Sequence, residues 1–451
     1  MNSKEEVVAK ELLRIIRDKN ISELSQVLQR MNPVDIAKSM EELDDKSLLV
    51  VFRLLIKDTS AEVFSYLDKE SQQRIIELIT DDEVKEIIEK LFLDDTVDII
   101  EELPANIVGK IISNTSLEKR KLINQFLKYE EDSAGAIMTI EFIDFKEKMT
   151  IKEAIDYTRK TGIDKESLDN CFIIDGERRL KGIISLKDLI LSDENMLLSE
   201  VMETNIVLVK TFEDQEKVAD LFKTYDLLSM PVVDIENRLV GIITVDDIVD
   251  IIEQENTEDF QKMAGMEPNE EPYLKTPVLT LAKNRIVWLL VLMISATVTG
   301  SIIQEFEDVL QSVVILASFI PMLMDTGGNS GSQSSTLVIR GLALGEITTK
   351  DFLKVIFKEF RVSIVVATVL CIVNFLRLYF FTSADLMISL TVCASLFFTV
   401  ILAKVVGGIL PIISKKLKLD PAIMASPLIT TIVDAFALVV YFCFAKLLLG
   451  I

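Results

Sequence analysis

The sequence contains no histidine among its 451 residues and only four cysteines, which are scattered along the chain. No two cysteines form a CxxC pair, so neither a zinc site nor a disulfide framework is indicated. A bound metal ion would therefore have oxygen ligands, which suit Mg²⁺, Ca²⁺ or Mn²⁺. The sequence also shows no nucleophile–base pair and no phosphate-binding loop, so an enzyme is the class that it favours least.

Basic residues are scarce in the first part of the chain. Residues 284–451 hold 12 Lys+Arg and 10 Asp+Glu, which leaves 48 − 12 = 36 basic and 71 − 10 = 61 acidic residues in positions 1–283. Their net charge of 36 − 61 = −25 argues against nucleic acid and against an anionic lipid surface as partners. It favours cations, although most of these acids are expected only to solvate helix faces.

The N-terminal region reads as a set of short helices. The first residues, MNSKEEVVAKELL, are charged and lack the apolar core of a signal peptide, so we expect this part to stay in the cytoplasm. Further along, apolar residues recur at helical spacing between turn signals such as Asn32-Pro33 and Leu103-Pro104. Each segment is too short to be stable alone. We therefore predict a superhelical, acidic domain over residues 1–132, suited to packing or partner binding.

Residues 133–198 and 199–256 look like one α/β unit written twice. Gly182, Ser185 and Asp188 recur 59 residues later as Gly241, Thr244 and Asp247. This repeat closely resembles the CBS domain, two copies of which usually pack into one pseudo-symmetric module that senses a ligand. In many CBS pairs this turn contacts adenosine nucleotides. The resemblance thus implies four nucleotide candidates, with an unliganded structural pair as the alternative: Ser185, Asp188, Thr244 and Asp247.

The remaining residues read as a linker and a membrane domain. We expect an acidic connecting helix over residues 257–284. Basic residues gather in the loops 340–361 and 412–420 and are absent from the alternate loops 305–308 and 381–385, so the former face the cytoplasm. The pattern predicts a multi-pass plasma-membrane protein with its N-terminus inside and its C-terminus outside. Its five apolar segments are each long enough to span a bilayer: about 286–304, 309–339, 362–384, 386–411 and 421–446.

The second apolar segment contains an unusual polar run, GGNSGSQSST, over residues 327–336. Such a run is poorly suited to face lipid, and irregular backbone at membrane depth is tolerated where it lines a cavity. We therefore predict a broken helix whose carbonyls and side-chain oxygens face a pathway. The alternative is a tight helix–helix contact through small residues.

The last apolar segment, Pro421–Ala445, carries one charged residue, Asp434, near its middle. A carboxylate at that depth is costly and indicates an ion or proton path. Thr430 and Thr431 lie one turn before it. The alternative is a structural ion pair with Lys404 or Lys446.

The membrane motifs GGNSGSQSST with RGLALGE, and DPAIMASPLITTIVDAF, follow a CBS pair and an acidic helical domain. In this order they resemble the MgtE family of magnesium channels over essentially the whole chain. The resemblance implies a multidomain membrane protein with an all-α superhelical N-domain, an α/β CBS pair, a connecting helix and a transmembrane domain of five helices. It also implies a homodimer with a pore along its axis, closed by cytoplasmic Mg²⁺ bound between the N-domain and the CBS domains.

The same resemblance assigns residues to roles, with Asp434 as the pore aspartate. Ser332 departs from the pattern, because some relatives carry Asn there. The other pore-lining residues it implies are Gly328, Asn329, Gly331, Ser332, Thr430 and Thr431. It also implies that Asp420 faces the cytoplasmic mouth of the pore as a metal ligand. The regulatory Mg²⁺ residues it implies are Glu62, Asp94, Asp98, Gly135, Ala136, Asp214, Glu216, Asp226, Asp247, Asp250, Glu255, Glu258 and Asp259.

These features together predict a Mg²⁺-selective channel that takes up magnesium and is gated closed by cytoplasmic Mg²⁺, with ATP as a further ligand of the CBS pair. Because Mg²⁺ holds its water tightly, we expect two facing Asp434 carboxylates to recognise a largely hydrated ion. Two alternatives stay open. One is a carrier coupled to protons or sodium through Asp434, and the other is a CBS nucleotide sensor with a membrane anchor.

Overall fold

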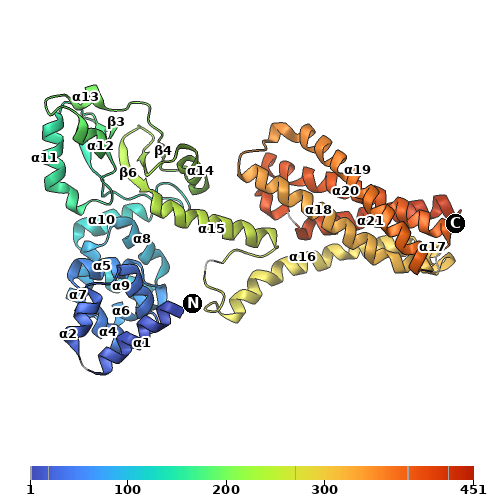
Figure 1. Ribbon diagram of the computed structural model, residues 1–451, viewed down its shortest axis with the longest axis horizontal. Coiled ribbons are helices and arrows are strands. Elements are labelled where there is room, and N and C mark those ends of the chain that lie inside the picture. The colour runs from blue at the N-terminus through green and yellow to red at the C-terminus, as the bar shows by residue number, and fades with distance from the viewer. Residues whose placement is uncertain (1–2, 19, 270, 383–384, 425, 451) are drawn as a thin grey trace. The chain divides into compact units, whose positions relative to one another are not determined.

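A computed structural model describes residues 3–18, 20–269, 271–382, 385–424 and 426–450. The chain divides into two compact units, Met1–Ile252 and Glu253–Ile451. Figure 1 shows the helices and strands of each unit. Residues 383–384, where the third predicted span ends, and residue 425, within the last predicted span, lie outside the described residues.

The first unit begins with the predicted helical domain. Several of its short helices start at side-chain caps: Asn32 accepts a hydrogen bond from the Val34 N–H, and Thr80 forms a capping box with Glu83. Odd-numbered helices pack on the next odd-numbered helix, as α1 does on α3 and α5 on α7. This staggered packing confirms the all-helical domain. Its helices are α1 (Ser3–Arg17), α2 (Ile21–Leu28), α3 (Pro33–Met40), α4 (Asp45–Leu54), α5 (Lys57–Ser65), α6 (Lys69–Leu78), α7 (Asp81–Lys90), α8 (Leu93–Glu102), α9 (Ala105–Asn114) and α10 (Leu117–Phe126).

Two three-stranded sheets follow, one in each copy of the repeat. In each sheet the first strand pairs parallel with the second, and the second pairs antiparallel with the third. The first copy contains β1 (Asp144–Lys146), α11 (Ile151–Thr161), η1 (Gly162–Asp164), β2 (Asn170–Ile174), β3 (Leu180–Ser185), α12 (Leu186–Leu191) and α13 (Leu198–Val201). The second contains β4 (Val209–Lys210), α14 (Gln215–Tyr225), β5 (Ser229–Val233), β6 (Leu239–Thr244) and the start of α15 (Val245–Met263). The α/β repeat is thus confirmed.

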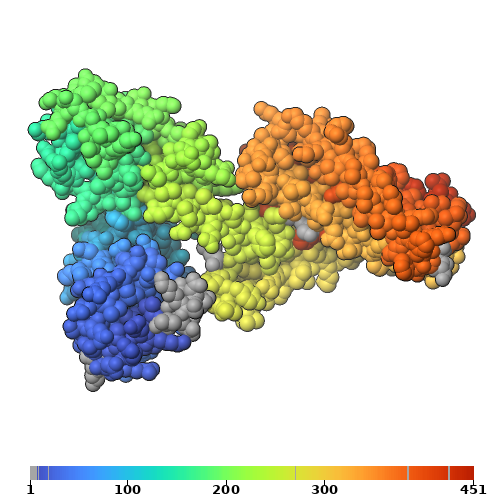
Figure 2. Space-filling model, viewed as in Figure 1, coloured from blue at the N-terminus to red at the C-terminus, as the bar shows by residue number. Residues whose placement is uncertain are grey.

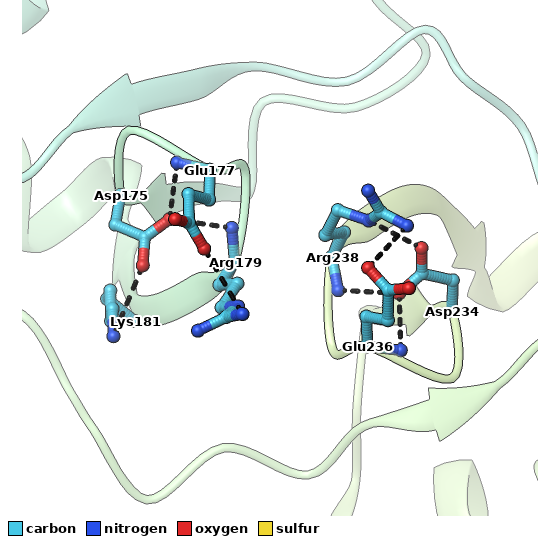
Figure 3. A network of polar contacts seen from close by, with 7 residues as sticks. All are labelled: Asp175, Glu177, Arg179, Lys181, Asp234, Glu236 and Arg238. Carbon is cyan, nitrogen blue, oxygen red and sulfur yellow. Dashed lines mark hydrogen bonds and ion pairs between the residues drawn. The ribbon is translucent and has the colours of Figure 1, made fainter.

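The two copies meet at matching hairpin turns (Figure 3). In the first turn Asp175 accepts hydrogen bonds of 2.9 Å from the backbone N–H groups of Glu177 and Arg179. In the second, Asp234 accepts bonds of 2.8 and 2.9 Å from those of Glu236 and Arg238. The residues before Arg179 and Arg238 have a left-handed backbone, with φ of 64° at Arg178 and 61° at Asn237. Backbone bonds then join the turns, from Leu180 N to Asn237 O and from Leu239 N to Arg178 O.

One hydrophobic core joins the helical domain to the second copy of the repeat. It runs from Leu12 in α1 through Phe126 in α10 to Val232 in β5 and Ile251 in α15. Figure 2 shows the two parts as one continuous surface, blue to green. Because this core is shared, residues of α8 and of the start of α15 have fixed positions relative to each other.

The connecting segment differs from the prediction of a helix over residues 257–284. Helix α15 ends at Met263, and α16 (Val278–Glu305) begins only after Pro277. Between them Gly265 has a φ of 70°, and a Cβ there would lie 2.2 Å from the Trp288 ring. The predicted single helix is therefore wrong, because a left-handed glycine packed under an indole turns the chain.

The membrane unit contains five long helices. In the described part of the chain, four helices are long and apolar enough to cross a membrane, and Ile320–Ala343, which holds most of the second of the five predicted spans, is not among the four. Helix α19 begins ten residues before the predicted span at 362, and α20 continues through Pro411 to Lys416. The elements are α16, α17 (Glu307–Ser312), η2 (Val314–Phe319), α18 (Ile320–Ala343), η3 (Thr349–Asp351), α19 (Phe352–Phe381), α20 (Leu386–Lys416), η4 (Pro421–Met424) and α21 (Ser426–Leu449).

Helix α18 corrects two further expectations. The predicted span from 309 to 339 is divided, because residues before Ile320 form the short α17 and η2. The polar run itself does not break the helix, which is continuous over 24 residues, or about 36 Å at ~1.5 Å per residue. A Cβ on Gly407 of α20 would lie 2.2 Å from the carbonyl oxygen of Gly331. The glycines therefore serve close helix contact, which was the alternative interpretation.

Candidate functional site

Helices α18 and α21 pack antiparallel along the polar run. At one end the Ser335 hydroxyl donates to the Met424 carbonyl (3.1 Å), and at the other the Tyr441 hydroxyl donates to the Leu316 carbonyl (2.9 Å). Between these bonds, a Cβ on Gly328 would lie 2.9 Å from Cγ2 of Thr430. These contacts bring the two sequence-predicted membrane motifs together, although about a hundred residues separate them.

Asp434 lies one turn beyond this contact on α21. It is half-buried, and Asp325 of α18 is close enough for its charge to act on Asp434. Both lysines offered as ion-pair partners are engaged elsewhere. Lys404 donates to the Ser330 carbonyl (3.4 Å) and to Gln333 Oε1 (3.3 Å), and Lys446 lies 4.9 Å from the centroid of the Phe306 ring. The structural ion pair is therefore absent from the described residues.

The predicted pore-lining residues fall into two groups. Asn329 is exposed, whereas Ser332 is half-buried and donates its hydroxyl to the Gly328 carbonyl (2.9 Å). Gly328 and Gly331 are buried against α21. Thr430 and Thr431 both donate their hydroxyls to the Pro427 carbonyl near the start of α21, at 2.9 and 3.1 Å. Asn329 is therefore exposed, and the half-buried hydroxyls of Ser332, Thr430 and Thr431 keep lone pairs that can still accept a hydrogen bond.

A second acidic site lies in the first unit, between α8 and the start of α15. We call it the inner acidic cluster: Asp94, Asp95, Asp98, Glu166, Asp246 and Asp247. Oδ1 of Asp94 and Oε2 of Glu166 are buried and have no hydrogen-bond partner among the described residues. The charges of Asp94 and Asp95 act on Lys119, whose ammonium donates to carbonyls at the end of α7.

Two members of the inner acidic cluster, Asp98 and Asp246, are exposed, and the protonation of its four half-buried members reflects burial and crowding. Burial raises the pKa of Asp94 well above its usual range, and the charges of Asp95 and Asp247 raise it further. Burial and the charge of Asp247 raise the pKa of Glu166 to about 8. Burial also raises the pKa values of Asp95 and Asp247 to about 6. These carboxylates repel one another, so a cation among them would relieve the repulsion.

Three members of the inner acidic cluster were predicted, namely Asp94, Asp98 and Asp247, whereas Asp95, Asp246 and Glu166 were not. The loop from α11 to β2 has eight residues, 162–169, and that from α14 to β5 has three, 226–228. Glu166 lies in this longer loop, which the second copy lacks, so the repeat could not reveal it. Within the described residues, no three acids are already arranged to hold a metal ion.

The other predicted regulatory residues lie around this cluster or apart from it. Glu62 is exposed, and its charge acts on Tyr66 together with those of Asp95 and Asp246, so it lies at the rim. Gly135 donates its N–H to the Thr211 carbonyl (2.9 Å), and Ala136 donates to the Ser133 carbonyl. Three predicted acids belong to α14 or its caps. Asp214 is the N-cap, Glu216 is exposed in the first turn, and Asp226 is the left-handed C-cap. Four lie on α15, of which the first is exposed and the others are half-buried: Asp250, Glu255, Glu258 and Asp259.

A third acidic site belongs to the membrane unit and joins α15 to the segment before α21. Lys262 forms an ion pair of 2.8 Å with Asp420 and a second one with Glu258. Burial opposes the charge on Lys262, but its bonds to Asp420 and Glu258 hold its pKa above the usual range. Asp259 is half-buried beside them. The predicted ligands Asp420, Glu258 and Asp259 therefore do come together, but around a lysine that was not predicted.

The nucleotide candidates form two equivalent local pairs. Ser185 donates to the Asp188 carboxylate (2.6 Å) and accepts from the Asp188 N–H (3.0 Å) at the start of α12. Thr244 donates to Asp247 (2.7 Å) at the start of α15. Asp188 is exposed, whereas Asp247 belongs to the inner acidic cluster, where a phosphate would be repelled. The two copies therefore offer different surfaces to an anionic ligand.

Known families match the helical domain, the repeat and the membrane unit in the predicted order. Residues 320–444 match a family described as a divalent cation transporter, MgtE, residues 31–132 match the MgtE intracellular N domain, and residues 134–194 and 198–254 match the CBS domain. The chain is 38% identical to the magnesium transporter MgtE of Thermus thermophilus over 330 residues, and this aligned region covers 73% of each chain. It is 37% identical over 331 residues to that of Bacillus subtilis, again over 73% of each.

Two solved structures resemble the cytosolic part. One is the cytosolic domain of the Mg²⁺ channel MgtE in complex with ATP, which is 35% identical with a TM-score of 0.51 and covers 54% of this chain and 99% of that chain. The other is the soluble part of a magnesium transporter, which is 27% identical with a TM-score of 0.53 and covers 56% and 99% of the two chains. Both match the α-helical domain followed by the repeat.

Proposed function

The chain belongs to the MgtE family, and we infer from this and from the geometry above that it transports Mg²⁺ across a membrane under the control of cytosolic Mg²⁺. The family is one of magnesium transporters and not a class of enzymes. The observation that supports the proposal is the antiparallel packing of α18 on α21, in which Gly328 lies against Thr430, one turn before Asp434.

The ion path is proposed to run along these two helices and to involve a second copy of the chain. A carboxylate and an exposed amide at membrane depth are costly against lipid, so they favour a water-filled path. Mg²⁺ holds its water and binds through one or two carboxylates. Asp434 from two copies of the chain would supply both, with Asn329 and the threonine hydroxyls bonding through water. Selectivity then depends on the size of the hydrated ion.

The gate is proposed to be electrostatic. Without a cation, the inner acidic cluster repels itself, and its buried oxygens on Asp94 and Glu166 lack partners among the described residues. Cytosolic Mg²⁺ would bind there and favour the compact state, and its differential affinity for that state sets the size of the shift. The site around Asp420 would add to this response. The soluble unit and the N-terminus are proposed to face the cytoplasm, and the C-terminus the outside.

ATP is proposed as a further ligand of the first CBS copy. A related cytosolic domain is solved in complex with ATP. Asp188 is exposed and is held by a hydrogen bond from Ser185, so its carboxylate is available to bind ribose hydroxyls. The equivalent Asp247 lies among other acids, which would repel the phosphates of ATP. A titration with ATP should therefore lose its signal in Asp188→Ala and keep it in Asp220→Ala, which alters an exposed acid on α14.

The transport proposal is tested with the purified protein in liposomes loaded with a Mg²⁺-sensitive dye. Wild-type protein should admit Mg²⁺, and Asp434→Asn should reduce the rate at least about tenfold, because it removes the charge that compensates the ion. Asp308→Asn makes the same change at an exposed position on α17 and should transport normally. Full transport by Asp434→Asn would contradict the proposal.

A further inference from the structure

We propose that Asp325 is a second carboxylate of the ion path, so that each subunit offers two acids to the permeating cation. This proposal rests on the proposed function and names a further residue of the same path. In the sequence, Asp325 is the one charged residue between Asp308 and Arg340.

The register of the two helices places Asp325 at the level of Asp434. Residue numbers fall along α18 as they rise along α21. Added Cβ atoms on Gly331, Gly328 and Gly327 would meet Ile429, Thr430 and Val433 in turn, at 2.7 to 3.0 Å. Beyond the pair of Gly327 and Val433, the same antiparallel register brings Asp325 of α18 to the level of Asp434 of α21. The charge of Asp325 does act on Asp434, which agrees with this register.

Asp325 begins a polar face that runs along α18. Its exposed polar members recur every three or four residues: Asp325, Asn329, Gln333 and Thr336. Residues at this spacing lie on one face of a helix. The other side of α18 is buried against α20 and α21, whereas Asp325, Asn329 and Thr336 are exposed. Gln333 is also exposed, but it accepts a hydrogen bond of 3.3 Å from Lys404 of α20. A face headed by a carboxylate is too costly to leave against hydrocarbon, which indicates that water covers it.

The carboxylate of Asp325 is also held in place. The Asn329 amide donates a hydrogen bond of 3.0 Å to Asp325 Oδ1, one helical turn away. This bond orients the carboxylate along the polar face. Two like charges on neighbouring helices repel each other, and a divalent cation between or beside them removes that cost. A monovalent ion compensates only half as much charge, so Asp325 should favour divalent over monovalent ions.

The proposal is tested by recording Mg²⁺ and Na⁺ currents of the full chain in patches from reconstituted liposomes. Asp325→Asn should raise the half-saturating Mg²⁺ concentration roughly tenfold, equivalent to about 1.4 kcal/mol, and should admit Na⁺ when Mg²⁺ is present. Asp325→Glu, which keeps the charge, should restore most of the divalent preference. Asp308→Asn serves as the matched control, since it removes an exposed carboxylate outside the path.

The outcomes separate this proposal from the proposed function. If wild-type protein carries Mg²⁺ and Asp434→Asn abolishes the current, but Asp325→Asn matches wild type in both readouts, Asp325 has no role and the inference is overturned. If wild-type protein carries no Mg²⁺, the proposed function itself fails. Asp325→Asn protein that elutes as aggregate, while Asp325→Glu folds and shows the wild-type half-saturating concentration, would support a need for the charge at this position.

Discussion

The Lys262 ammonium lies 2.8 Å from Oδ2 of Asp420 and also pairs with Glu258. A cation that belongs to the protein thus occupies a position where the sequence predicts ligands for Mg²⁺. Because two positive charges compete for the same carboxylates, Lys262 is expected to set the Mg²⁺ concentration at which this site fills.

Replacing Lys262 by glutamine should make closure more sensitive to cytosolic Mg²⁺. The change frees Asp420 and Glu258 for the ion, so the half-inhibitory Mg²⁺ concentration should fall about three- to tenfold, or ~0.6–1.4 kcal/mol. Patch recordings with Mg²⁺ varied on the cytosolic side would measure it. Lys85→Gln, which removes an exposed charge from α7, should leave the concentration unchanged. A rise in the half-inhibitory concentration for Lys262→Gln would show that the lysine assists closure.

The stability of the first unit should fall as pH rises. Glu166 has a pKa of about 8, and Asp95 and Asp247 have values of about 6, against about 4 for unfolded carboxyls. The folded unit therefore holds more protons between pH 4 and pH 8, and it loses that advantage as pH rises through these values. Without Mg²⁺, Tm should drop by several degrees between about pH 5.5 and about pH 8.5.

Millimolar Mg²⁺ should reverse most of that drop at the higher pH. It should have little effect at the lower pH, because protons and Mg²⁺ compete for the same carboxylates. Scanning calorimetry of the full chain at both pH values, with and without the ion, would test this. An equal Mg²⁺ effect at both pH values would contradict binding at the inner acidic cluster.

Replacing Asp94 by asparagine should separate stability from Mg²⁺ sensing. Oδ1 of Asp94 is buried without a hydrogen-bond partner among the described residues, so removing its charge should stabilise the Mg²⁺-free protein by about 1–2 kcal/mol. The gain in Tm on adding Mg²⁺ should shrink at the same time. Thermal unfolding with and without Mg²⁺ measures both effects. Asp220→Asn, on the exposed side of α14, should alter neither quantity.

Replacing Gly407 by alanine should disrupt the membrane unit. Its Cβ would lie 2.2 Å from the Gly331 carbonyl oxygen, and backbone atoms cannot move aside as a side chain can. We expect the free energy of unfolding to fall by ~1–3 kcal/mol. The fall would be seen as a lower melting temperature in detergent and as reduced transport. Gly300→Ala on α16 has nothing within 4 Å of the added Cβ and should be tolerated or slightly stabilising. Equal melting temperatures for the two variants would argue against the close contact of α18 and α20.

Much of the architecture could be predicted because it depends on local patterns. The 59-residue repeat identified the paired sheets, and helical spacing identified the N-terminal domain. The course of α18 could not be predicted, since its glycines favour a break locally. Packing of Gly327, Gly328 and Gly331 against neighbouring helices stabilises the helix in spite of that preference, and such contacts do not appear in the sequence.

The candidate sites show a similar division. Asp434 was identified because a single charge in an apolar segment is costly, and the same rule applied to Asp325 would have identified it too. Glu166 lies in a loop that the second copy lacks. The partner of Lys262, Asp420, lies 158 residues away in the sequence, so no local pattern could join them.

The most direct test of the account is a recording of Mg²⁺ current through the full chain while Mg²⁺ on the cytosolic side is raised through the millimolar range. The account predicts a current that follows voltage and the Mg²⁺ gradient, survives collapse of the pH gradient, and falls steeply as cytosolic Mg²⁺ rises. A current that stops when the pH gradient is removed, or one that cytosolic Mg²⁺ leaves unchanged, would contradict it.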